Sequence, residues 1–295
     1  MFREGLKVVE FFGKFVKEIY NKLISIQRGR YKMSLKVSLI QMDVKYGKPD
    51  VNYRKVAELV AAAMTEHPDV LILPEMWNIG YALEQLEELA DQNGEHTQSF
   101  LAALARKYQV NIIGGSVATS KNNFYYNTSY VFDREGKLQS EYDKVHLFGL
   151  MHEDQWVTAG TRRNCFKLDN IPAAGVICYD IRFPEWERTL MGEGAKILFV
   201  SAQWPRERIK QWQLLLQARA IENQVFVVAV NRVGKSPSGD VFNGHSLVID
   251  PLGNIISNIP VAKEGAFTTK LDLTMLEKIR GEIPVFTDRR PELYD

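Results

Sequence analysis

Cys178 lies where a predicted strand meets a predicted helix, a position at which a thiol can act as a nucleophile. The small and apolar residues 174–177 indicate the end of a buried strand. Phe183-Pro184-Glu185 indicates a helix start, because proline fits the first helical turn and glutamate favours its positive end. Backbone N–H groups and the helix dipole can lower the pKa of a thiol there and stabilise an oxyanion. The structural alternative is that Cys178 is only a small buried residue of the apolar core.

Two further polar residues follow predicted strands. Glu75 comes after the apolar strand of residues 69–73 and precedes two large apolar residues, which makes its carboxylate a candidate general base. A helix N-cap is the structural alternative for this residue. Lys144 also follows a strand and precedes apolar residues. Lysine is rarely buried without a partner, so Lys144 is either a functional ammonium group or an ordinary solvated lysine of a loop.

Composition excludes several classes of protein. The chain has 295 residues and a formal net charge of +1, which argues against binding nucleic acid through general basicity. Its two cysteines form no disulfide framework and indicate a reducing, cytoplasmic environment. The five histidines show no metal-ligand spacing, and no apolar run approaches the ~20 residues that span a bilayer. We therefore expect no metal site.

Residues 1–32 differ from the rest of the chain. They are rich in lysine and arginine, and their apolar residues fall on one stripe of a helix, which predicts a basic amphipathic extension; the stripe consists of Val8, Phe12, Phe15, Ile19 and Leu23. Such a helix can dock on the protein or on a second subunit, lie on an anionic membrane surface, or be peripheral to the fold. Residues 33–295 contain no linker and are predicted to form one domain.

Within that domain, strands and helices alternate. The predicted strands cover residues 35–41, 69–73, 110–117, 124–132, 137–142, 174–178, 196–201, 225–230, 246–249 and 266–271. The predicted helices cover residues 51–65, 99–108, 185–192 and 207–223, with one more helix near the C-terminus. Helices between strands, together with a hairpin turn at residues 133–136, predict an α/β fold with mixed rather than purely parallel sheets.

Three segments, in this order, resemble the signature segments of the nitrilase superfamily of carbon–nitrogen hydrolases. They are Leu73-Pro-Glu75, Lys144-Val-His-Leu-Phe148 and Cys178-Tyr-Asp-Ile-Arg-Phe-Pro-Glu185. The supporting segments at residues 203–205, 218–224, 231–234 and 250–253 also look like those of this family. The resemblance covers the chain from Leu35 to about its C-terminus. It implies a four-layer α-β-β-α sandwich and a homodimer or higher homo-oligomer.

The resemblance also implies a Glu-Lys-Cys triad. Glu75 is expected to act as general base and acid, Lys144 to stabilise the oxyanion and Cys178 to attack the amide carbonyl. Glu153 matches a second glutamate of the family that orients the lysine or the substrate. The expected reaction forms a thioester and releases ammonia, with the backbone N–H of Tyr179 as a second oxyanion donor. No cofactor is implied.

The segment at residues 178–185 looks most like the omega-amidase branch, whose substrates are 2-oxo dicarboxylic monoamides. Arg182 is a candidate for binding the substrate carboxylate, and a structural salt bridge with Glu185 or Glu222 is the alternative interpretation. Trp204 and Phe148 either line the pocket or belong to the core. Alternative functions are an N-carbamoyl amide hydrolase, a nitrilase and a catalytically silent scaffold. The other cysteine, Cys165, is predicted to be dispensable.

Overall fold

The computed structural model describes residues 33–294. The predicted amphipathic helix at residues 1–32 therefore lies outside the described part of the chain. None of the helices within residues 33–294 is long and apolar enough to cross a membrane.

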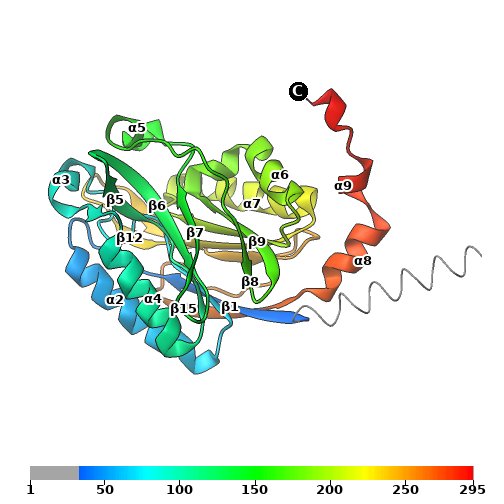
Figure 1. Ribbon diagram of the computed structural model, residues 1–295, viewed down its shortest axis with the longest axis horizontal. Coiled ribbons are helices and arrows are strands. Elements are labelled where there is room, and N and C mark those ends of the chain that lie inside the picture. Colours follow the sequence, from blue (N-terminus) through cyan, green and yellow to red (C-terminus); the bar gives the residue numbers. More distant parts are fainter. Residues whose placement is uncertain (1–32, 295) are drawn as a thin grey trace, which may run out of the picture.

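Two β-sheets pack face to face in the centre of the molecule (Figure 1). The eight-stranded sheet has the order β15-β1-β2-β4-β6-β5-β3, with β7 paired to β6. Its strands are β1 (Ser34–Gln41), β2 (Val70–Ile72), β3 (Asp91–Gln92), β4 (Asn111–Ile113), β5 (Val117–Lys121), β6 (Phe124–Phe132), β7 (Leu138–Asp143) and β15 (Gly265–Asp272). The sheet is mixed, because β1 pairs parallel to β2 and antiparallel to β15.

The second sheet has five strands in the order β14-β11-β10-β9-β8. They are β8 (Cys165–Leu168), β9 (Ile171–Ile177), β10 (Ile197–Ala202), β11 (Phe226–Asn231) and β14 (Leu247–Ile249). The central strands β9, β10 and β11 are parallel, while β8 and β14 pair antiparallel at the edges. Every residue of β10 and β11 is buried, which explains their continuous apolar sequences. A small hairpin consists of β12 (Val233–Lys235) and β13 (Val241–Asn243).

Helices cover the outer face of each sheet. Helices α2 (Pro49–Ala63) and α4 (Glu95–Tyr108) pack on the first sheet, and α6 (Pro184–Gly192) and α7 (Ile209–Asn223) pack on the second. A third apolar cluster joins the inner faces of the two sheets. The layers therefore follow the order α-β-β-α, which matches the predicted four-layer sandwich.

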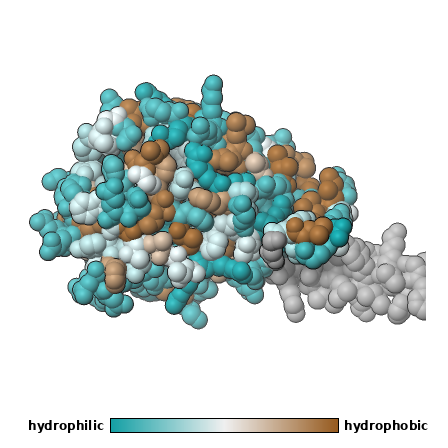
Figure 2. Space-filling view, turned by 90° about the horizontal axis from the view of Figure 1, so that it is seen from above, coloured by the Kyte–Doolittle hydropathy of each residue, from teal (hydrophilic) through white to brown (hydrophobic). Residues whose placement is uncertain are grey.

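The remaining helices are short or lie near the C-terminus. They are α3 (Leu86–Leu89), α5 (Glu153–Trp156), α8 (Thr274–Glu282) and α9 (Val285–Asp288). Turns of 3₁₀-helix occur at Met64–Glu66, Leu83–Gln85, Gly149–Met151, Cys178–Arg182, Arg206–Arg208 and Pro291–Leu293. Figure 2 shows a face that is largely hydrophilic, with hydrophobic patches scattered among the polar side chains. Scattered apolar side chains do not by themselves mark an interface, so the expected dimer remains a prediction.

The predicted strand at residues 110–117 is wrong in one respect, because it is two strands, β4 and β5. The chain turns between them at Gly114 and Gly115. Gly115 has a φ of +63°, and a Cβ there would lie 2.1 Å from the carbonyl oxygen of Pro74. Glycine is needed because the turn passes this close to the backbone beside Glu75. Ser116 holds the two segments together, since its N–H donates to Pro74 O at 3.1 Å.

Candidate active site

Side chains from three separate turns meet between the two sheets. Glu75 follows β2, Lys144 follows β7, and Cys178 follows β9. Lys144 Nζ lies 2.8 Å from Glu75 Oε1 and 2.7 Å from Glu153 Oε2. The side chains of Glu75, Lys144 and Glu153 are fully buried. The structure thus brings the predicted lysine and both predicted glutamates into one ionic cluster.

The backbone at Cys178 is bent sharply. Its φ is +45°, in the left-handed region that costs a non-glycine residue ~1–3 kcal/mol. Cys178 begins the 3₁₀ turn Cys178–Arg182, which connects β9 to α6. The strand and the helix predicted on either side of the thiol are both present. The Sγ atom lies 4.0 Å from the backbone oxygen of Gln203, on the neighbouring strand end.

A buried carboxylate ties this turn to the lysine segment. Asp180 Oδ2 accepts hydrogen bonds from Ile177 N at 2.9 Å and from the Tyr142 hydroxyl at 2.8 Å. Asp180 Oδ1 accepts from His146 N at 3.1 Å and lies 2.8 Å from His146 Nδ1. Tyr142 and His146 flank Lys144 by two residues on each side. Asp180 therefore fixes the relative position of the segments that carry Cys178 and Lys144.

The two oxygens of Glu75 have different surroundings. Oε1 accepts hydrogen bonds from Lys144 Nζ at 2.8 Å, the Tyr81 hydroxyl at 2.5 Å and Asn127 Nδ2 at 3.0 Å. Oε2 accepts one, from Gln203 N at 2.9 Å. Because Gln203 also contacts the Cys178 thiol through its backbone oxygen, Oε2 is the oxygen on the thiol side. Oε1 is saturated with donors, and Oε2 keeps the capacity to take a proton.

Our sequence analysis missed Tyr81 and Asn127. Asn127 lies within β6, and its Nδ2 also donates to Glu153 Oε1 at 2.8 Å. The same strand also contains Thr128 and Ser129, so a polar residue within it was no distinct signal. Tyr81 lies in an irregular turn after Glu75, and nothing in its sequence neighbourhood marks it.

Glu153 sits at the start of α5 and is held as firmly as Glu75. Its Oε2 accepts from Phe148 N at 2.9 Å as well as from Lys144. Burial raises the pKa of Glu153, and Lys144 opposes this rise. For Lys144, burial lowers the pKa, but the charges of Glu153 and Glu75 outweigh it and the pKa is raised. Lys144 therefore stays a charged ammonium group.

Burial decides the pKa of the Cys178 thiol. A strand-to-helix junction can lower the pKa of a thiol, but burial raises the pKa of Cys178 well above its usual value. The negative charge of Glu75 raises this pKa further, and Lys144 lowers it by less. Desolvation outweighs the helix dipole here because the thiol is enclosed. The resting thiol is therefore protonated, and it would have to give its proton to a base before it could act as a nucleophile.

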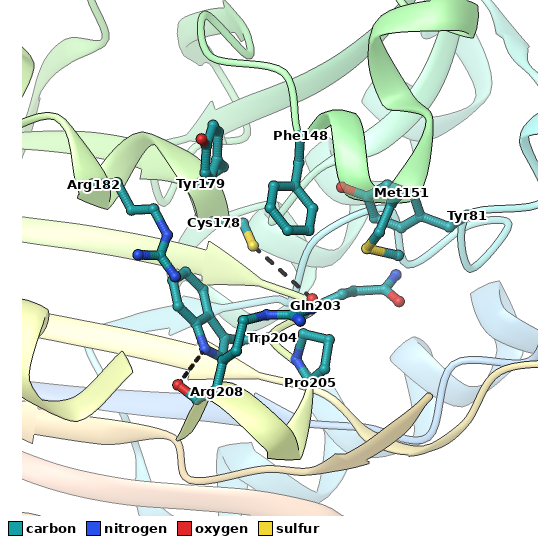
Figure 3. A pocket seen from close by; sticks show the side chains of 10 residues that line it. All are labelled: Tyr81, Phe148, Met151, Cys178, Tyr179, Arg182, Gln203, Trp204, Pro205 and Arg208. Atoms are coloured by element: carbon teal, nitrogen blue, oxygen red, sulfur yellow. Dashed lines mark hydrogen bonds between the residues drawn. The ribbon is translucent and has the colours of Figure 1, made fainter. Parts of the chain in front are cut away.

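A pocket of about 290 Å³ opens onto the thiol (Figure 3). Its walls are formed by aromatic rings and two arginines around Cys178; the lining residues are Tyr81, Phe148, Met151, Cys178, Tyr179, Arg182, Gln203, Trp204, Pro205 and Arg208. The three residues predicted to bind the substrate, Phe148, Arg182 and Trp204, are among them, and so is Tyr179, whose backbone N–H is the expected oxyanion donor. In Figure 3 the Cys178 sulfur points toward Gln203, in the middle of these side chains.

The two arginines lie on aromatic faces. The guanidinium carbon of Arg182 is 4.9 Å from the ring centre of Trp204, and its Nη2 donates to Gln211 Oε1 at 2.8 Å. Among the described residues Arg182 forms no salt bridge with Glu185 or Glu222, and Glu222 pairs with Arg219 at 2.8 Å.

Arg208, which our sequence analysis missed, is the second of these arginines. Its guanidinium carbon lies 5.6 Å from the ring centre of Phe148. It enters the pocket from the 3₁₀ turn Arg206–Arg208, just after the Gln203-Trp204-Pro205 segment. Only its nearness to that segment could have indicated it.

Cys165 lies away from this pocket. It is exposed on the edge strand β8, and its Sγ is 3.8 Å from Leu190 O. Residues 33–294 contain no cluster of three or more histidine, cysteine, aspartate or glutamate side chains that could hold a metal ion.

Comparison with known proteins identifies the family. The family model described as "Carbon-nitrogen hydrolase" matches residues 36–281. The chain is 47% identical to 2-oxoglutaramate amidase of Bacillus subtilis (strain 168) over 262 residues, which cover 89% of this chain and 100% of that protein. It is 29% identical to Omega-amidase NIT2 of Homo sapiens over 270 residues, which cover 88% of this chain and 97% of that protein.

Solved structures agree with this result. A CN-hydrolase superfamily protein of Xanthomonas campestris with an arsenic adduct in its active site superposes with a TM-score of 0.82 at 29% identity, covering 88% of this chain and 98% of that one. Nit3 of Saccharomyces cerevisiae, a member of the nitrilase superfamily, superposes with a TM-score of 0.81 at 28% identity. The match covers 88% of this chain and 97% of that one. With its mixed sheets and matching relatives, the chain belongs to the carbon–nitrogen hydrolase family of the nitrilase superfamily.

Proposed function

We propose that this amide-hydrolysing enzyme acts on 2-oxo dicarboxylic monoamides such as 2-oxoglutaramate, releasing ammonia as an omega-amidase does. The observation that carries the substrate proposal is the pair Arg182 and Arg208 in the wall of a pocket whose thiol is Cys178. Arginine pairs with carboxylates through two parallel hydrogen bonds, so this wall suits the acid end of such a substrate. The relatives named as 2-oxoglutaramate amidase and omega-amidase support the same substrate class.

The first half of the proposed reaction forms a thioester. Glu75 Oε2 takes the proton of the Cys178 thiol as Sγ attacks the amide carbon. The charge that develops on the carbonyl oxygen is stabilised by the Lys144 ammonium group and the N–H of Tyr179. Glu75 then gives its proton to the amide nitrogen, the C–N bond breaks, and ammonia leaves.

The second half releases the acid. Glu75 takes a proton from a water molecule, and the resulting hydroxide attacks the thioester carbon. The C–S bond breaks, and the proton on Glu75 returns to Cys178 Sγ. Water and an amide have become an acid and ammonia, and every group is restored. Glu153 holds Lys144 throughout, because their atoms are 2.7 Å apart and both side chains are buried.

Ammonia release from a substrate panel tests the proposal. The panel contains 2-oxoglutaramate, 2-oxosuccinamate, glutamine, an N-carbamoyl amino acid and a simple nitrile, each with the wild type and Cys178→Ala. We expect release from the 2-oxo amides and loss of it in the variant. Faster turnover of the nitrile or the N-carbamoyl compound would contradict the substrate assignment. Equal release by Cys178→Ala would contradict the thioester mechanism, and no release from any substrate would favour a silent scaffold.

We also propose that residues 33–295 are the catalytic domain of a cytoplasmic homodimer and that residues 1–32 are not needed for catalysis. The basic amphipathic sequence of this extension supports contact with an anionic membrane surface. Flotation with anionic liposomes, comparing the full chain with a chain that starts at Met33, tests this contact. Equal flotation of both chains would remove the membrane proposal.

A further inference from the structure

Tyr81 connects the substrate pocket with the buried ionic cluster. Tyr81 lines the pocket beside Cys178 and also an adjoining cavity of about 840 Å³ that is open to solvent. Its hydroxyl lies 2.5 Å from Glu75 Oε1 and 3.4 Å from Glu153 Oε1, and Lys144 Nζ donates to it at 3.3 Å. Tyr81 thus lines the pocket and also contacts the Glu75 carboxylate directly.

We propose that Tyr81 is a positioning residue for Glu75. Its hydroxyl, together with the amide of Asn127 and the ammonium of Lys144, occupies Glu75 Oε1, so that only Oε2 is left to exchange a proton with Cys178. The inference rests on the role of Glu75 in the proposed function.

The backbone conformation of Tyr81 supports a functional reason for its contact with Glu75. Tyr81 has a φ of +65°, and Gly80 before it has a φ of +64°. A bulky residue in the left-handed region costs ~1–3 kcal/mol and persists where surrounding contacts demand it. The N–H of Gly80 donates to Met76 O at 2.8 Å, which folds the chain back on itself and returns the phenol to Glu75.

The phenol acts as a fixed donor and not as an acid or base. Burial raises the pKa of Tyr81 far above its usual value, and the charges of Glu153, Glu75 and Cys178 raise it further. The hydroxyl therefore keeps its proton at neutral pH. The groups that face Glu75 are then Lys144, Glu153, the Cys178 thiol and this neutral hydroxyl.

Tyr81→Phe removes the hydroxyl and keeps the ring. We expect kcat to fall about 10- to 100-fold, since a hydrogen bond to a charged group is lost, with KM changed by less than about 3-fold. The acid limb of the kcat/KM profile should move to higher pH, because a carboxylate with one donor fewer binds its proton more readily. Loss of kcat with an unmoved acid limb would show that Tyr81 only shapes the pocket, and would overturn the proposal.

Tyr53→Phe is the matched control. Tyr53 is also buried, and its hydroxyl contacts Thr97 Oγ1 at 2.5 Å, in the apolar cluster between α2, α4 and the first sheet. This variant loses the same phenol oxygen as Tyr81→Phe, from a buried position outside the active site. We expect its kcat and its acid limb to match the wild type. A shift as large as that of Tyr81→Phe would mean that any buried hydroxyl produces the effect.

Alkylation of Cys178 by iodoacetamide separates this inference from the substrate proposal. The rate is measured against pH in a Cys165→Ser background, so that one thiol reacts, and it needs no substrate. Tyr81→Phe should shift the acid limb of alkylation in the same direction as that of kcat/KM. An unchanged alkylation profile would overturn the role of Tyr81, whereas failure of the 2-oxo amides in the panel would overturn only the substrate.

Discussion

The two sides of Cys178 hold their charges in different ways. On one side, Glu75, Lys144 and Glu153 are fully buried, and each is bound by several donors or acceptors. On the other side, Arg182 and Arg208 lie on aromatic faces at 4.9 and 5.6 Å, at the surface of an open pocket. In the proposed mechanism, the groups that move protons are therefore fixed from many directions, and the arginines that would bind the substrate keep room to adjust.

The cost of disturbing each side follows from its surroundings. Removing one partner of a buried ion pair leaves the other charge without compensation, which costs ~3–5 kcal/mol. An arginine at a solvent-accessible pocket wall loses less, because water replaces its partner. Variants of the buried cluster should therefore affect chemistry and stability, and variants of the arginine wall should affect substrate affinity.

Glu75→Gln should have the largest effect. It keeps the size of the side chain and removes the proton acceptor that faces Cys178 through Oε2. We expect kcat to fall by about 10³-fold or more, the upper part of the range for a general base. Ammonia release measures this, and mass spectrometry of the quenched reaction should show no acyl-enzyme. Activity above about one tenth of the wild type would contradict Glu75 as the base.

Lys144→Met should reduce stability more than any pocket variant. It leaves Glu75 and Glu153 as adjacent buried carboxylates, and we expect a loss of ~3–5 kcal/mol in the free energy of unfolding. The loss should depend on pH. The pKa of Glu153 is raised by burial above 4.5, its ordinary value, and Lys144 normally opposes this rise.

The sign of that dependence follows from the raised pKa. A carboxyl group with a higher pKa in the folded than in the unfolded protein stabilises the fold below its unfolded pKa and loses this contribution as the pH rises through its folded pKa. The difference in Tm between wild type and Lys144→Met should therefore be larger near about pH 8 than near about pH 5. A difference independent of pH would contradict an uncompensated Glu153.

Arg208→Gln should act on affinity. We expect KM for 2-oxoglutaramate to rise about 10-fold or more, with kcat changed less, because a charge-assisted contact to the substrate carboxylate is weakened. KM for a neutral amide of similar size, measured in parallel, should change little. An equal rise of KM for both amides would mean that Arg208 shapes the pocket without binding the carboxylate.

Cys165→Ser should have the smallest effect. Cys165 is exposed on an edge strand and does not line the pocket. We expect kcat and KM to stay within about twofold of the wild-type values and Tm to stay within a few degrees, as for most surface substitutions. Loss of activity comparable to that of Cys178→Ala would show that the nucleophile is assigned incompletely.

The sequence predicts those features that are local. The apolar runs of β10 and β11 and the helix start at Pro184 identify their elements, and the segments around Glu75, Lys144 and Cys178 resemble a family by contiguous residues. Tyr81, Asn127 and Arg208 join the site only through tertiary contacts, so no local pattern marks them.

The raised pKa of Cys178 could not be predicted for a related reason. Its position between a strand and a helix is local, but the desolvation that dominates its pKa comes from the surrounding fold. The break at Gly114 and Gly115 likewise depends on the close approach of Pro74, from another turn.

The buried, protonated state of Cys178 also bears on oxidative damage. Peroxides and related oxidants react with thiolates far faster than with thiols, and the first product is a sulfenic acid. With its pKa raised by burial and by Glu75, the resting nucleophile exposes little thiolate to such reagents. In the proposed mechanism, the amide that occupies the pocket also covers the sulfur. The sensitivity of the enzyme to peroxide should therefore fall as the substrate concentration rises.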